Sequence, residues 1–128
     1  MSHVILLSGA DVTLTDRPIA LPVLHQNVAV NAVENVQVRD LIWGQKNLAQ
    51  FSPAYDVIIG ADIVYIEETF EDLLDTVDQL SDDRTVVLLS CQIRYDRDLT
   101  FIEMLRKRFT VELVHRNRNV KVFAARKL

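Results

Sequence analysis

Cysteine and histidine are scarce in this chain of 128 residues, and the scarcity excludes most kinds of metal centre. The one cysteine, Cys91, cannot form an internal disulfide or a multi-cysteine metal site, and a buried structural role is a better interpretation than a nucleophile. The three histidines, His3, His25 and His115, lack the spacing of metal ligands. We therefore predict that the protein holds no metal.

Glycine is equally rare, and long hydrophobic runs are absent. Gly9, Gly44 and Gly60 are the only glycines, and none belongs to a Gly-x-Gly loop of the kind that holds a nucleotide cofactor. No apolar stretch approaches the roughly 20 residues that span a bilayer. The start of the chain lacks the basic flank of a signal peptide. These absences predict a protein of the cytoplasm, with the nucleus as the alternative, and no membrane partner.

Charge is distributed unevenly along the sequence. The net charge of −4 argues against a nucleic-acid partner, because phosphate binding needs clustered cations. Ten acidic residues and no Lys or Arg lie between Asp56 and Asp83, whereas ten of the fourteen basic residues lie between Arg94 and the end. We interpret both regions as solvated surfaces. A second role for the acids, steering a lysine-bearing partner, stays open.

Short apolar segments alternate with helical patterns along most of the chain. We expect strands at 10–15, 36–42, 55–61, 85–91, 110–115 and 120–125, and helices near 20–28, 70–80 and 101–109, the last with Asp98 as a cap. This alternation predicts the α/β class, with a doubly wound and mostly parallel sheet, in a single domain over residues 1–128. The short, turn-prone connection at 116–119 requires the last two strands to form an antiparallel hairpin.

Acidic residues directly follow two of the expected strands. Asp16 closes the first strand, where a carboxylate either accepts hydrogen bonds from a ribose or caps the next helix. Asp62 follows the strand that ends at Gly60 and Ala61. With Tyr65 it either lines a pocket that positions an amine or acts as a cap or ion-pair partner. Both acids are candidate site residues, because ligands of such sheets bind beyond the carboxyl ends of the strands.

Trp43 is the only tryptophan and stands at the end of a strand. Its flat face could stack on a heterocycle, although packing against the sheet edge is slightly favoured by spacing alone. We expect Asp16, Trp43 and Ala61 to converge on one crevice, because each lies at a strand end. A phospho-receiver domain is a distant alternative, since it needs a lysine where this chain has Ser90-Cys91-Gln92.

Four segments carry a resemblance to a known family. Asp11–Asp16, Leu41–Gly44, Asp56–Tyr65 and Leu88–Tyr95 resemble the seven-β-strand protein-lysine methyltransferases of the methyltransferase-like twenty-one group. Within that group, the members that act on heat-shock-seventy chaperones are the most similar. The Asp-x-x-Tyr pattern after Gly-Ala is the most specific of these features.

The resemblance implies a reaction and a set of site residues. Methyl would pass from S-adenosylmethionine to a lysine ε-amine of a protein substrate, and a chaperone is the expected substrate. Asp16 matches the family's ribose-binding acid, Trp43 its adenine-side aromatic and Ala61 the residue whose backbone contacts the cofactor. Asp62 and Tyr65 match the pair that lines the lysine entry. We expect a monomer.

The resemblance starts only at Val4–Ala10. It therefore implies a Rossmann-like, seven-strand methyltransferase sheet that lacks its first strand and the glycine loop after it. We expect a truncated form with impaired or absent activity. The alternative is a non-catalytic protein-interaction domain derived from the same fold.

Overall fold

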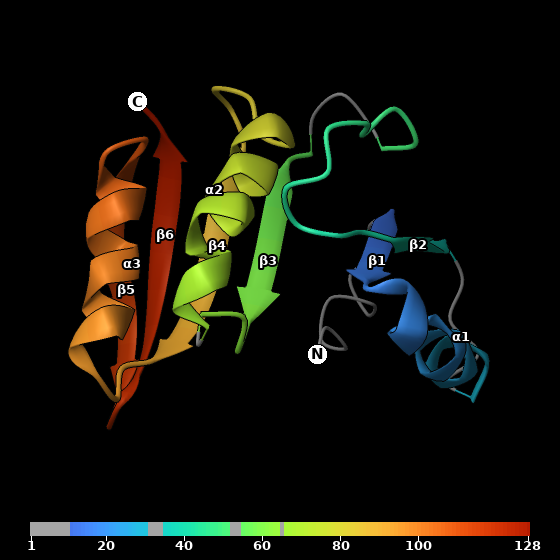
Figure 1. The fold of residues 1–128 in the computed structure, drawn as a ribbon, viewed down its shortest axis with the longest axis horizontal. Coiled ribbons are helices and arrows are strands. Elements are labelled where there is room, and N and C mark those ends of the chain that lie inside the picture. Colours follow the sequence, from blue (N-terminus) through green and yellow to red (C-terminus); the bar gives the residue numbers. More distant parts are fainter. Residues whose placement is uncertain (1–10, 31–34, 52–54, 65) are drawn as a thin grey trace. The chain divides into compact units, whose positions relative to one another are not determined.

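The computed structural model describes residues 11–30, 35–51, 55–64 and 66–128 (Figure 1). Its elements are β1 (Val12–Asp16), α1 (Leu21–Val30), β2 (Val36–Asp40), β3 (Val57–Ala61), α2 (Phe70–Gln79), β4 (Val86–Gln92), α3 (Asp96–Arg106), β5 (Phe109–Asn117) and β6 (Val120–Lys127). Single 3-10 turns, Pro18–Ala20 and Glu67–Thr69, precede the first two helices. The predicted alternation of strands and helices is thus confirmed.

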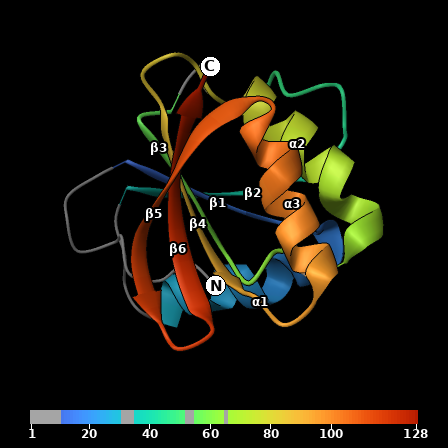
Figure 2. The same ribbon diagram turned by 90° about the vertical axis from the view of Figure 1, so that its left-hand side faces the viewer.

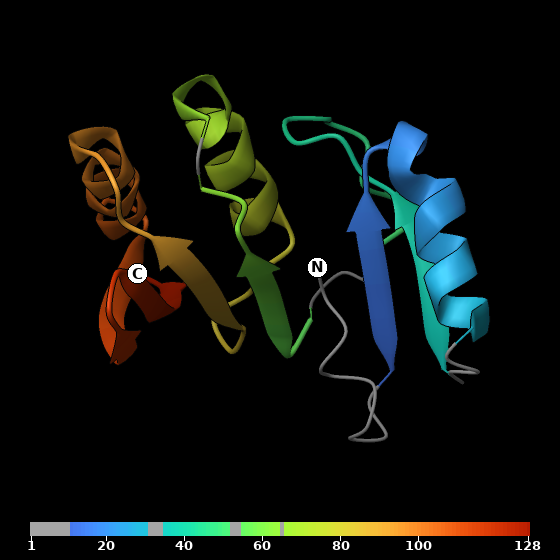
Figure 3. The ribbon, with the colours of Figure 1, turned by 90° about the horizontal axis from the view of Figure 1, so that it is seen from below.

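The chain forms two compact units, one over residues 2–42 and the other over residues 43–128. In the first unit β1 pairs in parallel with β2, from Val12 opposite Val36 to Asp16 opposite Asp40. Helix α1 lies along this strand pair (Figure 3). None of its residues is buried. Pro22 stands at its second position, where a proline costs no helical hydrogen bond.

The second unit is a four-stranded sheet with the order β3-β4-β6-β5. The pairing of β3 with β4 is parallel, and β6 pairs antiparallel with both β4 and β5. The predicted hairpin is therefore confirmed. Arg118 has a positive φ of 58° in its tight turn, and a bulge lies between Leu113 and His115. The bulge leaves Val114 without a partner in the ladder and increases the local twist of the hairpin.

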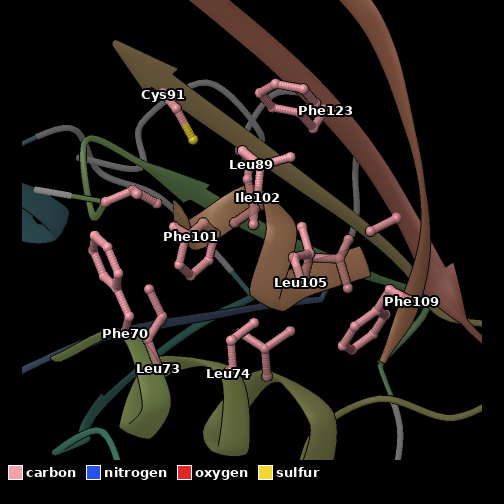
Figure 4. Packing of buried hydrophobic residues seen from close by; sticks show 14 residues of the cluster. Phe70, Leu73, Leu74, Leu89, Cys91, Phe101, Ile102, Leu105, Phe109 and Phe123 are labelled. Atoms are coloured by element: carbon pink, nitrogen blue, oxygen red, sulfur yellow. The ribbon is translucent and has the colours of Figure 1, made fainter. Parts of the chain in front are cut away.

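Helices α2 and α3 cover the same face of this sheet (Figure 2). In α2, Phe70, Leu73, Leu74 and Val77 recur at helical spacing and are buried, while acidic residues occupy the solvent side. Figure 4 shows the side chains of Phe70, Leu73 and Leu74 facing Phe101 and its neighbours in α3. The Phe70 and Phe101 rings meet edge to face, with centroids 5.2 Å apart. One continuous core therefore joins both helices to the sheet.

Each unit has a strand edge without a strand partner among the described residues. In the first unit β1 pairs only with β2, and in the second unit β3 pairs only with β4. The other face of the second unit's sheet carries exposed Val57 and Ile59. Because α1 belongs to the first unit, the doubly wound arrangement stays a prediction. Among the described residues, no helix has the length and apolar character needed to cross a membrane.

Candidate active site

The candidate site is built around the chain reversal at the end of β3. Asp62 follows the strand and has a positive φ of 57°, a conformation that few residues other than glycine adopt. Its backbone N–H donates to the carbonyl of Ser90, 3.3 Å away. Gly60 makes the close packing here possible, since a side chain at this position would collide with Ile63 and Leu89. The strained turn leaves the Asp62 carboxylate exposed at the carboxyl ends of β3 and β4.

A pocket of about 380 Å³ opens beside this carboxylate. Its wall comes from the ends of β3 and β4 and the start of α3. The lining residues are Asp62, Val64, Gln92, Arg94, Tyr95, Arg97 and Asp98. The volume lies in the range of small-ligand and side-chain pockets. The position is the one at which parallel sheets bind their ligands.

Asp98 shapes the rim of the pocket from inside helix α3. Its side chain is 3% exposed, and its Oδ2 accepts the backbone N–H of Arg94 at 2.9 Å and of Tyr95 at 3.1 Å. The residue therefore does cap α3, although it lies in the first turn and Tyr95 is the N-cap. These bonds fix the backbone of both rim residues.

Cys91 lies behind the pocket and is 2% exposed. Burial raises the pKa of its thiol to about 11, and the carboxylates of Asp98 and Asp62 contribute in the same direction. A thiol with this pKa is protonated at neutral pH and is a poor nucleophile. The expectation of a buried structural cysteine is confirmed.

The predicted cofactor residues fall in different units. Asp16 ends β1 in the first unit, and its exposed carboxylate accepts the N–H of Arg17 at 2.8 Å. Trp43 belongs to the second unit and is half-buried against its core. Ala61 is the last residue of β3. Because each unit is described by itself, the convergence of the three residues stays a prediction, and Tyr65 lies outside the described residues.

Gly44, next to Trp43, is fixed by two features of α2. It has a positive φ of 88°, and its N–H donates to Thr76 Oγ1 at 2.8 Å. A side chain at Gly44 would meet Asp72 at 2.7 Å. The backbone after Trp43 is therefore anchored on α2 within the second unit.

The acidic side of α2 is partly neutralised by cations from the end of the chain. Arg108 contacts Asp75 at 2.6 Å and Glu71 at 2.8 Å, and Lys127 contacts Asp78 at 3.2 Å. The hydrogen bond that Arg108 donates to the Asp75 carboxylate, together with the surrounding acids, raises the pKa of Arg108 above its usual value. The acidic and basic regions of the sequence thus meet in an ion-pair network, which joins α2 to Arg108 just before β5 and to Lys127 at the end of β6. No cluster of metal-ligating side chains occurs in the part of the chain that the structure describes.

Two curated relatives match nearly the whole chain. Protein N-lysine methyltransferase METTL21A of Mus musculus is 46% identical over 128 residues, which is 94% of this chain and 58% of the relative. Protein N-lysine methyltransferase METTL21A of Danio rerio is 48% identical over 125 residues, which is 93% of this chain and 57% of the relative. The chain therefore spans somewhat over half the length of these relatives.

A solved structure shares the fold. A TehB-like SAM-dependent methyltransferase from Corynebacterium glutamicum is 15% identical and aligns with a TM-score of 0.65, covering 92% of this chain and 68% of that structure. That protein is described as dependent on S-adenosylmethionine. The family model described as lysine methyltransferase matches residues 1–108. With its Rossmann-like sheet, terminal hairpin and pocket beyond β3 and β4, the chain belongs to the lysine methyltransferase family.

Proposed function

We propose that the protein represented by this chain transfers a methyl group from S-adenosylmethionine to the ε-amine of a lysine in another protein. The observation that carries the proposal is the exposed Asp62 carboxylate in a pocket at the carboxyl ends of β3 and β4, in a chain of the lysine methyltransferase family. Within the described residues, no side chain forms an ion pair with Asp62, so its carboxylate is available to a substrate ammonium.

The residues of this chain divide into those that would hold the cofactor and those that would hold the amine. Asp16 has an exposed carboxylate that suits ribose hydroxyls, Trp43 a half-buried ring that suits the adenine, and Ala61 a strand-end backbone beside Asp62. When bound, S-adenosylmethionine supplies the methyl group, which would pass from its sulfonium sulfur to the neutral lysine nitrogen. Asp62, with Tyr65, would orient the ammonium and accept its proton.

The test is a methylation assay with a matched pair of variants. The N-terminal part of the Mus musculus relative is placed before this chain, and the protein is incubated with labelled S-adenosylmethionine and a heat-shock-seventy chaperone. Asp62→Asn should slow methyl transfer about a hundredfold, the usual contribution of a positioned acid–base group. Asp56→Asn, at the opposite end of β3, should leave the rate unchanged. Equal rates for both variants would remove Asp62 from the reaction.

The chain by itself is proposed to bind the cofactor weakly. Its sequence has no Gly-x-Gly loop, and β1 and β3 each have an edge without a strand partner among the described residues. Backbone N–H groups from a glycine loop are donors that side chains elsewhere do not replace. Calorimetric titration of the chain with S-adenosylmethionine should show no micromolar binding. Such binding, together with methyl transfer, would contradict this proposal and exclude a purely non-catalytic interaction domain.

The chaperone substrate, the monomeric state and the cytoplasmic location are proposals of the same kind. The similarity to METTL21A supports a protein lysine as the substrate, and the three finer proposals rest on the family resemblance of the sequence. Sedimentation of the purified protein checks the monomer, and fractionation of cells that express it checks the location. Mass spectrometry of the chaperone after the assay identifies the methylated lysine.

A further inference from the structure

The pocket beside Asp62 has features that the proposed methyl transfer does not use. Two arginines and a tyrosine stand on its rim, where α3 begins: Arg94, Tyr95 and Arg97. All three side chains are exposed, and Tyr95 is 61% exposed. A lysine needs a carboxylate and room for its aliphatic stem, but it has no use for two guanidinium groups. The two guanidinium groups could instead bind a second, negatively charged group of the substrate.

The pocket contains two carboxylates, and neither of them forms an ion pair with the arginines. Asp98 is buried, and its oxygen already accepts two backbone N–H groups. Asp62 is exposed and has no ion-pair partner among the described residues. Asp98 therefore binds the local backbone, whereas the carboxylate of Asp62 can bind an incoming cation.

The guanidinium groups are held in place without being paired to an acid. Arg94 donates to the side-chain oxygen of Gln92, and the Arg97 guanidinium lies 4.8 Å from the centre of the Tyr95 ring. Neither forms an ion pair in the part of the chain described by the structure. A guanidinium group that is oriented and unpaired is well suited to bind a carboxylate with two parallel hydrogen bonds.

We propose that this rim selects lysines that have an aspartate or glutamate nearby in the substrate chain. The substrate ammonium goes to Asp62, the exposed Tyr95 ring borders the lysine stem, and Arg94 and Arg97 bind the neighbouring carboxylate. Lysines surrounded by other cations are rejected, because two guanidinium groups repel them. The inference rests on the proposed function, since it assumes that a lysine enters this pocket.

Synthetic peptides test the selection by binding alone. The probes are fluorescein-labelled Ala/Gly peptides with one central lysine, flanked two residues away on each side by Glu, Gln or Arg. Anisotropy titrations of the fusion with the N-terminal part of the Mus musculus relative, with S-adenosylhomocysteine present, should give the order Glu, Gln, Arg from tight to weak, with the Glu peptide about fivefold tighter than the Gln peptide. Equal affinity for the Glu and Gln peptides would overturn the inference.

Variants assign the preference to the rim. Arg94→Gln with Arg97→Gln should abolish the difference between Glu and Gln peptides and leave the Gln peptide's affinity unchanged. Arg94→Glu with Arg97→Glu should reverse the order, so that the Arg peptide binds best. Trp43 fluorescence checks that each variant is folded. A Glu preference that survives both double substitutions would contradict the assignment.

A norleucine control separates this inference from the proposed function. A peptide with norleucine in place of lysine keeps the stem but lacks the charge, so it should bind more weakly if the lysine enters beside Asp62. If lysine and norleucine peptides bind equally, the lysine pocket itself is wrong. If lysine is preferred but flanking acids have no effect, only the role of the arginines is wrong.

Discussion

The two units of this chain use the same alternation of strand and helix but differ in what their helices bury. In the unit over residues 43–128, α2 alone buries Phe70, Leu73, Leu74, Thr76 and Val77. In the unit over residues 2–42, α1 buries nothing, and Leu14 and Leu41 are the buried hydrophobic residues of its described part. A strand pair with one helix is marginal, whereas four strands under two helices form a core. The pocket beside Asp62 belongs to the better packed unit.

The largest difference in stability between variants of the two units should come from truncating a buried aromatic side chain. Phe101 is fully buried between α2 and the sheet, so Phe101→Ala should lower the free energy of unfolding by about 3–5 kcal/mol. Val23, which is 60% exposed on α1, provides the control, and Val23→Ala should change stability by less than about 0.5 kcal/mol. Urea unfolding followed by Trp43 fluorescence measures both. Similar losses would mean that α1 packs far better than its exposure indicates.

Removing the Asp98 carboxylate should have the next largest effect. Asp98→Ala leaves the N–H groups of Arg94 and Tyr95 without their acceptor and should cost about 1–3 kcal/mol. Asp96 is exposed in the same helical turn, and Asp96→Ala tests the helix dipole alone, which contributes about 0.3–1 kcal/mol. The same unfolding measurement applies. If Asp98→Ala and Asp96→Ala cost the same free energy of unfolding, the Asp98 carboxylate would contribute no more than an exposed charge does.

Alkaline pH should destabilise the second unit through Cys91. Burial raises the pKa of this thiol to about 11 from a reference value of 9.0, so above pH 9 the folded state retains a proton that the unfolded state releases. Stability is therefore unaffected by this group below pH 9 and falls as the pH rises toward 11, by about 1 kcal/mol at pH 10. The difference between wild type and Cys91→Ala isolates the effect from other titrating groups. A difference that does not change with pH would contradict it.

The ion-pair network around Arg108 should make the smallest contribution to the free energy of unfolding. Arg108→Met removes the contacts with Glu71 and Asp75 and should cost about 1 kcal/mol or less at low salt, and less again in 1 M NaCl. Arg84 is 88% exposed and lies 3.9 Å from Asp82, so Arg84→Met should have almost no effect. Chemical unfolding at two salt concentrations makes the comparison. A cost for Arg108→Met that is independent of salt would point to packing of its stem instead of charge.

Periodic patterns predicted the elements well, because each pattern reports a local preference. The spacing of Phe70, Leu73, Leu74 and Val77 predicted α2, and the alternation on both sides of the turn at 116–119 predicted the β5–β6 hairpin. The division at residue 42 was not predicted. The division depends on which strands pair with one another. The apolar sequence pattern of β1 and of β3 is the same whether or not a second strand pairs with it.

The candidate site was predicted only in part. Asp62 was identified because an acid after an apolar strand lies where ligands bind, and the structure adds its positive φ and its pocket. Arg94 and Arg97 were not identified as site residues. A signal was available, since Arg94 lies just after β4 and Arg97 in the first turn of α3, and the carboxyl end of β4 lies beside that of β3. Asp98 was recognised as a cap, but its contact with the backbone of Arg94 and Tyr95 depends on tertiary geometry that spacing does not reveal.

Hydrogen exchange followed by mass spectrometry tests the difference between the two units most directly. Amides of β4, β6, α2 and α3 should exchange slowly and together, because they open only when the core around Phe101 and Leu105 unfolds. Amides of α1, β1 and β2 should exchange at least about a hundredfold faster, since little apolar surface covers them. Equal protection in both units would contradict the account.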